Sequence, residues 1–240
     1  MNGLTLTEQE LKKTVINSYP HVTFQLNQDI DAHVGLDFLE KQNGIDFSEH
    51  PLLRETLKVE GKARKKIVDD YVHRYYQDHK VELKNSLTSL QTEWEKVEPE
   101  FFDITNKLFN GYQWPSGDYK GFPSIFNCNP RWLETKSFQV YRNNVVGTSY
   151  SVAHEMLHFI FYDYLEKNDP DYIEQIGNEK LWSLSEVFDK LAFEQPEYKK
   201  FKPKVPSSYP QLQSTVTTLR EKLIGKPFNI QSFLTEAKLI

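Results

Sequence analysis

The residues in this sequence best suited to chemistry are His154, Glu155 and His158. Residues four apart on a helix lie on the same face about one turn apart, so both imidazoles can reach one ion. Zinc binds such nitrogens at about 2.0–2.1 Å. Glu155 follows the first histidine, where its carboxylate can take a proton from a water molecule that the ion has acidified. The spacing therefore predicts a zinc centre that activates water.

The neighbours of this motif are apolar. Between Val152 and Phe161 its three residues are the only polar ones. A buried helix tolerates such side chains only where they find partners, and a bound metal ion is one. The alternative interpretation is two core histidines hydrogen-bonded to their neighbours, with Glu155 on an exposed edge.

A zinc site that activates water needs a third protein ligand. No histidine follows His158, and Phe161 and Tyr164 stand where a longer zinc-peptidase motif requires glycine and histidine. The remaining donors downstream are carboxylates. We favour Glu186 as the third ligand and keep Glu179 as the reserve.

This preference rests on the helix expected at about residues 179–193. Its apolar stripe consists of Leu181, Leu184, Val187, Phe188 and Leu191. The opposite face, by the 3.6-residue period, carries Trp182, Glu186, Asp189 and Phe193. Acids mixed with large aromatics indicate burial against a polar site, although Glu186 could also be a solvent-facing carboxylate.

Two acids near Glu186 have open roles. Glu179 lies near the start of the helix, where an acid could simply interact with the helix dipole. Asp189 could accept a hydrogen bond from the outer nitrogen of His154 or His158, as partners of metal-bound histidines do. A structural salt bridge is the alternative for Asp189.

A His-Glu-x-x-His helix followed by a helix with a glutamate ligand resembles the gluzincin metallopeptidases, the thermolysin-like group. The short chain is similar to the minimal, single-domain gluzincins, and the resemblance covers about residues 120–215. It implies a Zn²⁺ cofactor, a peptide or protein substrate, His154, His158 and Glu186 as ligands, and Glu155 as general base.

The sequence also departs from this family. Thermolysin-like enzymes commonly use a later histidine to stabilise the oxyanion, and none is present. Other gluzincins use a tyrosine, which makes Tyr209 the candidate and Tyr198 and Tyr172 the alternatives. The pair Asn178-Glu179 is similar to a thermolysin-type glutamate motif, which keeps the choice of third ligand open.

The resemblance further implies an edge strand that pairs with extended substrate, either at about 138–142 or at 124–129. Three arginines, Arg131, Arg142 and Arg220, could bind a substrate carboxylate, but a surface role is favoured for each. Two other functions use the same residues. One is a catalytically inactive zinc-binding interaction module, a pseudopeptidase. The other is a hydrolase of non-peptide amides.

These residues must be positioned by an α+β fold that is mainly helical, with a small antiparallel sheet before the zincin-type active-site helix. We expect a mainly helical region at 1–110 and a catalytic region at 111–240, together forming one compact domain. Expected helices lie at about 7–18, within 53–109 as a hairpin of two or three, at 149–167, 179–193 and 210–224, and at the C-terminus. Expected strands lie at 21–26, 124–128 and 137–141.

Composition limits the class of protein. The net charge is −5, which argues against a nucleic-acid partner, and the basic run at 62–66 is expected to be a solvated helix face. No apolar run approaches the roughly 18 residues that span a bilayer, and no signal peptide is recognised. With one cysteine, Cys128, a cytoplasmic location is expected. The oligomeric state is left open.

Overall fold

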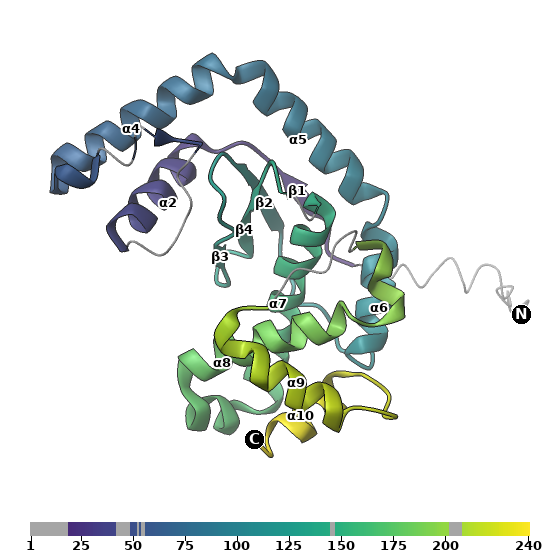
Figure 1. Cartoon of the computed structure of the whole chain (residues 1–240). Coiled ribbons are helices and arrows are strands. Elements are labelled where there is room, and N and C mark those ends of the chain that lie inside the picture. Colours follow the sequence, from purple (N-terminus) through teal and green to yellow (C-terminus); the bar gives the residue numbers. More distant parts are fainter. Residues whose placement is uncertain (1–18, 42–48, 52, 54–55, 145–146, 202–207) are drawn as a thin grey trace, which may run out of the picture.

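A four-stranded sheet lies at the centre of the structure, with helices on both sides (Figure 1). The computed structural model describes residues 19–41, 49–51, 53, 56–144, 147–201 and 208–240. Over these residues the protein is a mainly helical α+β fold, which confirms the expected fold class. The helix expected at 7–18 lies outside the described residues.

The sheet has the order β1-β2-β4-β3 and is mixed. Its strands are β1 (Val22–Phe24), β2 (Tyr119–Ser124), β3 (Arg131–Trp132) and β4 (Ser137–Tyr141). β1, β2 and β4 run parallel, and only β3 is antiparallel to its neighbour. The expected antiparallel sheet is therefore wrong. After β2 the chain passes into the edge strand β3 and then reverses direction into β4. Strand β4 therefore lies between β2 and β3 and runs parallel to β2.

The strand predictions need two further corrections. The run at 124–128 does not form a strand, because β2 ends at Ser124 and the next residues turn away into a second apolar cluster. The edge strand on this side of the sheet is β3, since the segment at 137–141 forms the interior strand β4. Neither of the two segments expected to pair with substrate is an edge strand.

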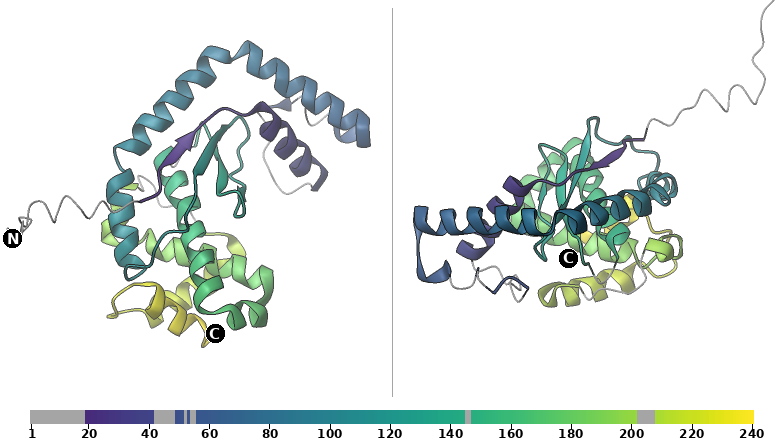
Figure 2. Two further views of the ribbon diagram at one scale, coloured as in Figure 1. Left: turned by 180° about the vertical axis from the view of Figure 1, so that it is seen from behind. Right: turned by 90° about the horizontal axis from the view of Figure 1, so that it is seen from above.

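The N-terminal helices form an arch over the sheet (Figures 1 and 2). After α2 (Gln28–Lys41) and the short η1 (Thr56–Lys58), α4 (Gly61–Asp78) and α5 (Lys80–Glu95) follow each other almost end to end, and α6 (Glu98–Leu108) completes the arch. The expected hairpin is wrong. α4 packs on α2, whereas α5 packs on β1, β2 and α7, so each helix buries its apolar face against a different partner.

The C-terminal half carries the helices α7 (Thr148–Asn168), α8 (Pro170–Ala192), α9 (Gln213–Lys222) and α10 (Ile230–Ala237). The 3-10 turns η2 (Pro196–Phe201) and η3 (Pro210–Leu212) connect them. α7 confirms the helix expected at 149–167. α8 starts earlier than expected, but Gly177 at φ 71° interrupts it, and its second part agrees with the expected 179–193.

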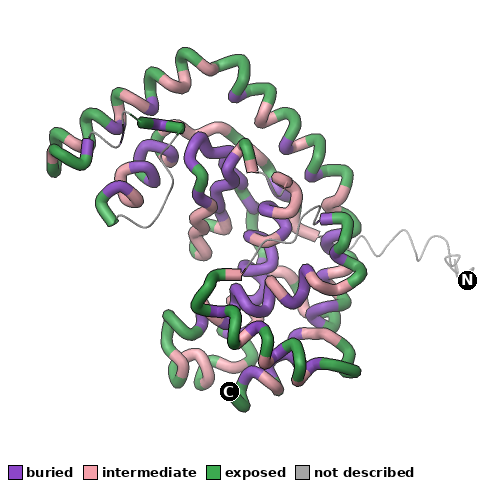
Figure 3. Tube along the Cα trace, in the orientation of Figure 1, coloured by how far each residue is buried: buried purple, intermediate pink, exposed green. Residues whose placement is uncertain are grey.

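Two apolar clusters form the core, and buried residues concentrate on the sheet and α7 (Figure 3). The larger cluster joins residues from both sides of position 110, from Val22 on β1 to Ala237 on α10. The smaller one fills the space between α2, α4 and residues 125–128. Strand β4 contributes to both sides of the sheet, because its side chains alternate. Phe138 and Val140 enter the larger cluster.

Asp31 joins the arch to the sheet on the other face. Its fully buried carboxylate accepts hydrogen bonds from Ser124 Oγ at 2.5 Å, Gln139 Nε2 at 2.8 Å and Tyr76 OH at 2.6 Å. These donors come from β2, β4 and α4, while Asp31 belongs to α2. A buried carboxylate with several donors is well satisfied, but its removal leaves each donor without a partner.

None of the helices in the described part of the chain is long and apolar enough to cross a membrane. The basic run at 62–66 lies at the start of α4, where Lys65 and Lys66 pair with Asp69 and Asp70 on the exposed face. The expectation of a solvated helix face is confirmed.

We predict that Asp31→Ala destabilises the protein by about 3 kcal/mol, because the buried donors around it lose their acceptor. Urea unfolding followed by circular dichroism measures this. The matched control is Asp29→Ala, an exposed acid on the same helix, which should change the free energy of unfolding by less than about 0.5 kcal/mol. Equal effects of the two substitutions would contradict the role assigned to Asp31.

Candidate metal centre

Helix α7 presents the motif because its apolar face is fully buried. The helix begins after Gly147, whose φ of 96° allows the chain to turn into it. Val152, Met156, Leu157 and Ile160 have no exposed surface and fix the rotation of the helix. His154 and His158 then face α8, and Glu155 faces strand β3.

Helix α8 supplies two carboxylates to the same point. Val187 and Phe188 are fully buried in the larger core, which turns Glu186 and Asp189 towards α7. Phe193 lies at the end of the same face, and its ring stacks with that of His154, with 6.5 Å between the ring centroids. The face predicted to mix acids with aromatics therefore does line the polar site.

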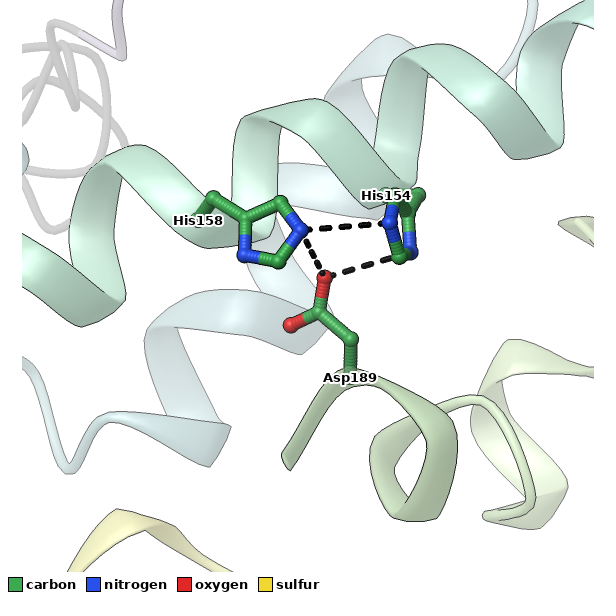
Figure 4. Close-up of side chains that lie close together, drawn as sticks. All are labelled: His154, His158 and Asp189. Carbon is green, nitrogen blue, oxygen red and sulfur yellow. Dashed lines mark hydrogen bonds and ion pairs between the residues drawn. The ribbon is translucent and has the colours of Figure 1, made fainter. Parts of the chain in front are cut away.

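The two imidazoles lie close together, with 3.1 Å between their Nε2 atoms. Glu186 Oε2 lies 3.5 Å from His154 Nε2, and its Oε1 lies 3.4 Å from His158 Nε2. Asp189 Oδ2 lies 3.3 Å from His154 Nδ1 and 3.4 Å from His158 Nε2. Figure 4 shows the carboxylate of Asp189 rising from α8 between the two rings.

His154, His158 and Asp189 can hold a metal ion, since one ligand atom from each lies within 4.8 Å of the others. Buried atoms without hydrogen bonds support this. They are Nδ1 of each histidine and both carboxylate oxygens of Asp189. Buried polar atoms are rarely left unsatisfied, because the desolvation penalty is then uncompensated. A cation bound near the two rings would provide a partner for the Asp189 carboxylate.

Arg131 is a member of the site that the sequence analysis assigned to the surface, and this expectation is wrong. Its side chain is only 15% exposed. Its guanidinium reaches Glu155 Oε2 at 3.3 Å and Glu186 Oε1 at 3.5 Å, and lies 5.8 Å from the centre of the Tyr162 ring. Local sequence pattern does not indicate this position, because it depends on β3 being the edge strand.

The charges of the site are unbalanced. With neutral imidazoles, three carboxylates face one guanidinium, which leaves two negative charges in a buried space. Burial consequently raises the pKa of Glu155 and holds that of Asp189 well above its usual range. A divalent cation would compensate both charges, since a nearby positive charge favours ionised carboxylates.

The surroundings shift the pKa values of the two histidines in opposite directions. Burial and the positive charges of Arg131 and His154 hold the pKa of His158 well below its usual value. Burial also acts to lower the pKa of His154, but Glu186 and Asp189 outweigh it and raise the pKa to about 9. Without a metal ion, the site thus favours a protonated His154. A bound metal ion would supply the positive charge in place of that proton.

A pocket of about 220 Å³ opens beside the imidazole of His154. Its lining includes Glu186 from α8 and Tyr150 from the first turn of α7. Tyr209 is also part of the lining, is 49% exposed, and contacts the Trp182 ring at 5.2 Å. The remaining wall is formed by the following residues, which had no signal in the sequence: Asn129, Asn144, Ser151, Lys190, Ser208 and Leu212.

Other residues considered from the sequence lie away from this site. Glu179 is exposed. Tyr198 is buried and hydrogen-bonded to Thr105, and the ring of Tyr172 lies under the ammonium of Lys238. Arg142 donates hydrogen bonds to Glu82 and Tyr75. Arg220 forms a bidentate ion pair with Glu194.

The chain matches no family model, no curated protein and no solved structure. The resemblance to the gluzincins therefore rests on the motif residues and their spacing.

We predict that a divalent cation stabilises the protein. A ligand that binds only the native state at 100 times its dissociation constant adds about 2.7 kcal/mol to the free energy of unfolding. Thermal unfolding with zinc or with a chelator measures the difference. His154→Ala should abolish the response, and His73→Ala, an exposed histidine on α4, should preserve it. If the unfolding temperature of the wild-type protein were the same with zinc and with a chelator, the assignment of a metal site would be contradicted.

Proposed function

We propose that this protein is a zinc-dependent metallopeptidase in which His154, His158 and Glu186 hold the ion. The spacing of the potential ligand atoms carries the proposal. Atoms bound to a tetrahedral zinc ion at about 2.0–2.1 Å lie roughly 3.4 Å apart. The two Nε2 atoms are 3.1 Å apart, and Glu186 offers one oxygen to each at 3.5 and 3.4 Å. The separation of the two imidazoles suits such a site, and Glu186 lies close enough to both rings to supply a third ligand.

Asp189 is the competing ligand, because its Oδ2 is also 3.4 Å from His158 Nε2. The same oxygen, however, is 3.3 Å from His154 Nδ1, the nitrogen that faces away from an ion bound at Nε2. Carboxylates in that position orient metal-bound histidines. We assign Asp189 this orienting role, with His154 as its partner.

A zinc ion held by these three residues would have room for one water molecule. A zinc ion supplies acidification of a water molecule and polarisation of the scissile carbonyl. Glu155 would accept a proton from water at the site and pass it to the leaving amine. Its carboxylate is 2% exposed, and burial raises its pKa, which favours proton acceptance. The open pocket next to His154 provides room for a peptide segment.

Tyr209 is the group we propose for the oxyanion. It lines the pocket with His154 and Glu186, and its hydroxyl can donate a hydrogen bond to a developing negative charge. Burial raises its pKa to about 12, so the phenol keeps its proton at neutral pH. The alternatives Tyr198 and Tyr172 are engaged elsewhere and do not line the pocket.

One observation favours the second candidate function, an inactive zinc-binding interaction module. The two imidazoles, Glu186 and Asp189 together offer four protein donors, and a structural zinc site has four protein ligands. Glu155 is also paired with Arg131, which holds the carboxylate away from a proton-accepting role. Turnover and metal content, measured on the same variants, separate the two functions.

We predict that Glu155→Gln retains zinc and the fold but loses peptide hydrolysis by about 10²–10⁴-fold, the usual contribution of a general base. Release of fluorescence from a quenched peptide library measures turnover, and elemental analysis measures zinc. Glu166→Gln is the matched control, as it is exposed on the same helix and should keep full activity. If Glu155→Gln hydrolysed peptides as fast as wild type, the mechanism would be refuted.

Isosteric variants identify the third ligand. Glu186→Gln should lose zinc during dialysis against a chelator, because an amide replaces a charged ligand. Asp189→Asn should still bind one zinc per chain, with affinity about 10–100-fold weaker, as expected for an orienting partner. Glu179→Gln, which changes an exposed acid, should match wild type. Loss of zinc in Asp189→Asn together with retention in Glu186→Gln would make Asp189 the ligand instead.

A further inference from the structure

The pocket beside His154 has a polar wall that the proposed hydrolysis does not explain. Among the residues that the structure describes, its lining contains one acid, Glu186, and one lysine, Lys190. Lys190 follows Glu186 by one turn of α8, so the two side chains lie on the same face of the helix. Once Glu186 is neutralised by a bound cation, the ammonium of Lys190 gives this wall a positive charge.

Lys190 belongs to a group of three charges that is positive as a whole. Its side chain is only 13% exposed, and its Nζ lies 3.5 Å from Glu194 Oε1. Glu194 also accepts two shorter hydrogen bonds from the guanidinium of Arg220, at 2.9 and 2.8 Å. One carboxylate thus faces two cations, and one positive charge remains to act on the pocket. An anion is the ligand that such a charge attracts.

Asn129 adds hydrogen-bond donors in a fixed orientation to the same lining. Its Oδ1 accepts a hydrogen bond from the backbone N–H of Tyr141 at 2.9 Å. Because an N–H can only donate, this bond identifies the oxygen and places the amide nitrogen, with its two donors, on the other branch. In the described part of the chain this nitrogen has no acceptor. A ligand in the pocket would supply one.

Tyr150 contributes a further donor, held in place by stacking. The centre of its ring lies 6.1 Å from that of His154 and 4.7 Å from that of Phe193. Its hydroxyl has no hydrogen-bond partner within the described ranges, and the residue lines the pocket. The hydroxyl of a largely buried tyrosine usually finds a partner. Here the pocket is the place from which that partner can come.

We propose that this pocket binds an acidic side chain of the substrate, so that the enzyme cleaves peptides next to a glutamate or an aspartate. This inference rests on the proposed function. An ionised carboxylate only accepts hydrogen bonds, at about four sites on its two oxygens, which suits a wall made of an amide nitrogen, a phenol and an ammonium. Bonds to an ionised group are also the stronger ones.

The rest of the lining favours a side chain over the end of a peptide chain. Leu212 and the rings of Tyr150 and Tyr209 offer apolar surface to the methylene groups that carry a side-chain carboxylate. A terminal carboxylate has no such groups. His154 and Glu186 belong to the same lining, so the acidic residue is a direct neighbour of the bond hydrolysed at the ion.

Binding of small probes tests this without requiring turnover. Isothermal titration of the zinc-loaded protein would compare N-acetylglutamate α-amide with N-acetylglutaminamide, which has the same shape but no charge. Wild type should bind the acid about 10-fold more tightly or better, as expected for hydrogen bonds to a charged group. Lys190→Met and Tyr150→Phe should each reduce the preference. Asn129→Asp should abolish it, because the new carboxylate still accepts the Tyr141 N–H but repels the ligand.

Lys180→Met is the matched control, since it removes an exposed lysine from the same helix and should preserve the preference. Equal binding of acid and amide by wild type would overturn the proposal. So would a preference that survives in both Lys190→Met and Asn129→Asp, because the acid would then bind the zinc ion directly. N-acetylnorvaline has its only carboxylate at the chain end, and its binding as tightly as the glutamate probe would overturn the side-chain assignment.

Cleavage assays separate failure of this inference from failure of the proposed function. Quenched peptides with glutamate or glutamine on either side of the scissile bond would be compared by kcat/KM, with the cut located by mass spectrometry. Glutamate should be favoured about 10-fold or more at one of the two positions. Cleavage at equal kcat/KM would contradict the inference and leave the peptidase standing. If no peptide is cleaved but the acid binds through Asn129 and Lys190, the proposed function fails while the carboxylate pocket stands.

Discussion

The burial of uncompensated negative charge between α7 and α8 is the constraint on which the site depends. Two imidazoles and three carboxylates lie in a region where the surrounding residues are aliphatic and aromatic. Arg131 compensates one of the three charges and a protonated His154 compensates a second, which leaves the third without a partner. Isolated charges in an apolar interior are costly, and proteins tolerate them mainly where they are paired or coordinate a metal. The geometry around His154 and His158 is the physical reason to expect a divalent cation.

The rest of the fold holds these groups at fixed distances. The apolar face of α7 packs against the sheet, and the apolar stripe of α8 packs into the same core, so the two helices face each other with their polar sides. Gly147 and Gly177 permit the backbone conformations that start α7 and interrupt α8. The Asp31 network ties the helical arch to the strands that precede the site.

Much of this arrangement was accessible from the sequence, for identifiable reasons. The 3.6-residue period and the turn residues located α7, most of α8 and α9, because helix formation depends on local pattern. The mixed face of α8 indicated that Glu186 and Asp189 meet the histidines. The parallel pairing of β2 with β4 and the arch of α4 and α5 were not predicted. Both depend on contacts between distant segments, which local periodicity does not encode.

Arg131 illustrates the same limit within the site. As a residue in a short loop-like segment it resembled any surface arginine, and only the order of the strands brings it to Glu155. The pocket wall, with its scattered polar residues, likewise has no sequence signature. Residues on the two site helices could therefore be foreseen, whereas a residue on the short edge strand β3 and those of the pocket wall could not.

The central claim is that two imidazoles and a carboxylate bind one zinc ion and leave a position for solvent. X-ray absorption at the zinc edge of the zinc-loaded protein measures the ligands directly. The account predicts two imidazole nitrogens at about 2.0–2.1 Å, with oxygen ligands from one carboxylate and water at about 2.0–2.2 Å. A spectrum without the scattering of two imidazoles would contradict it.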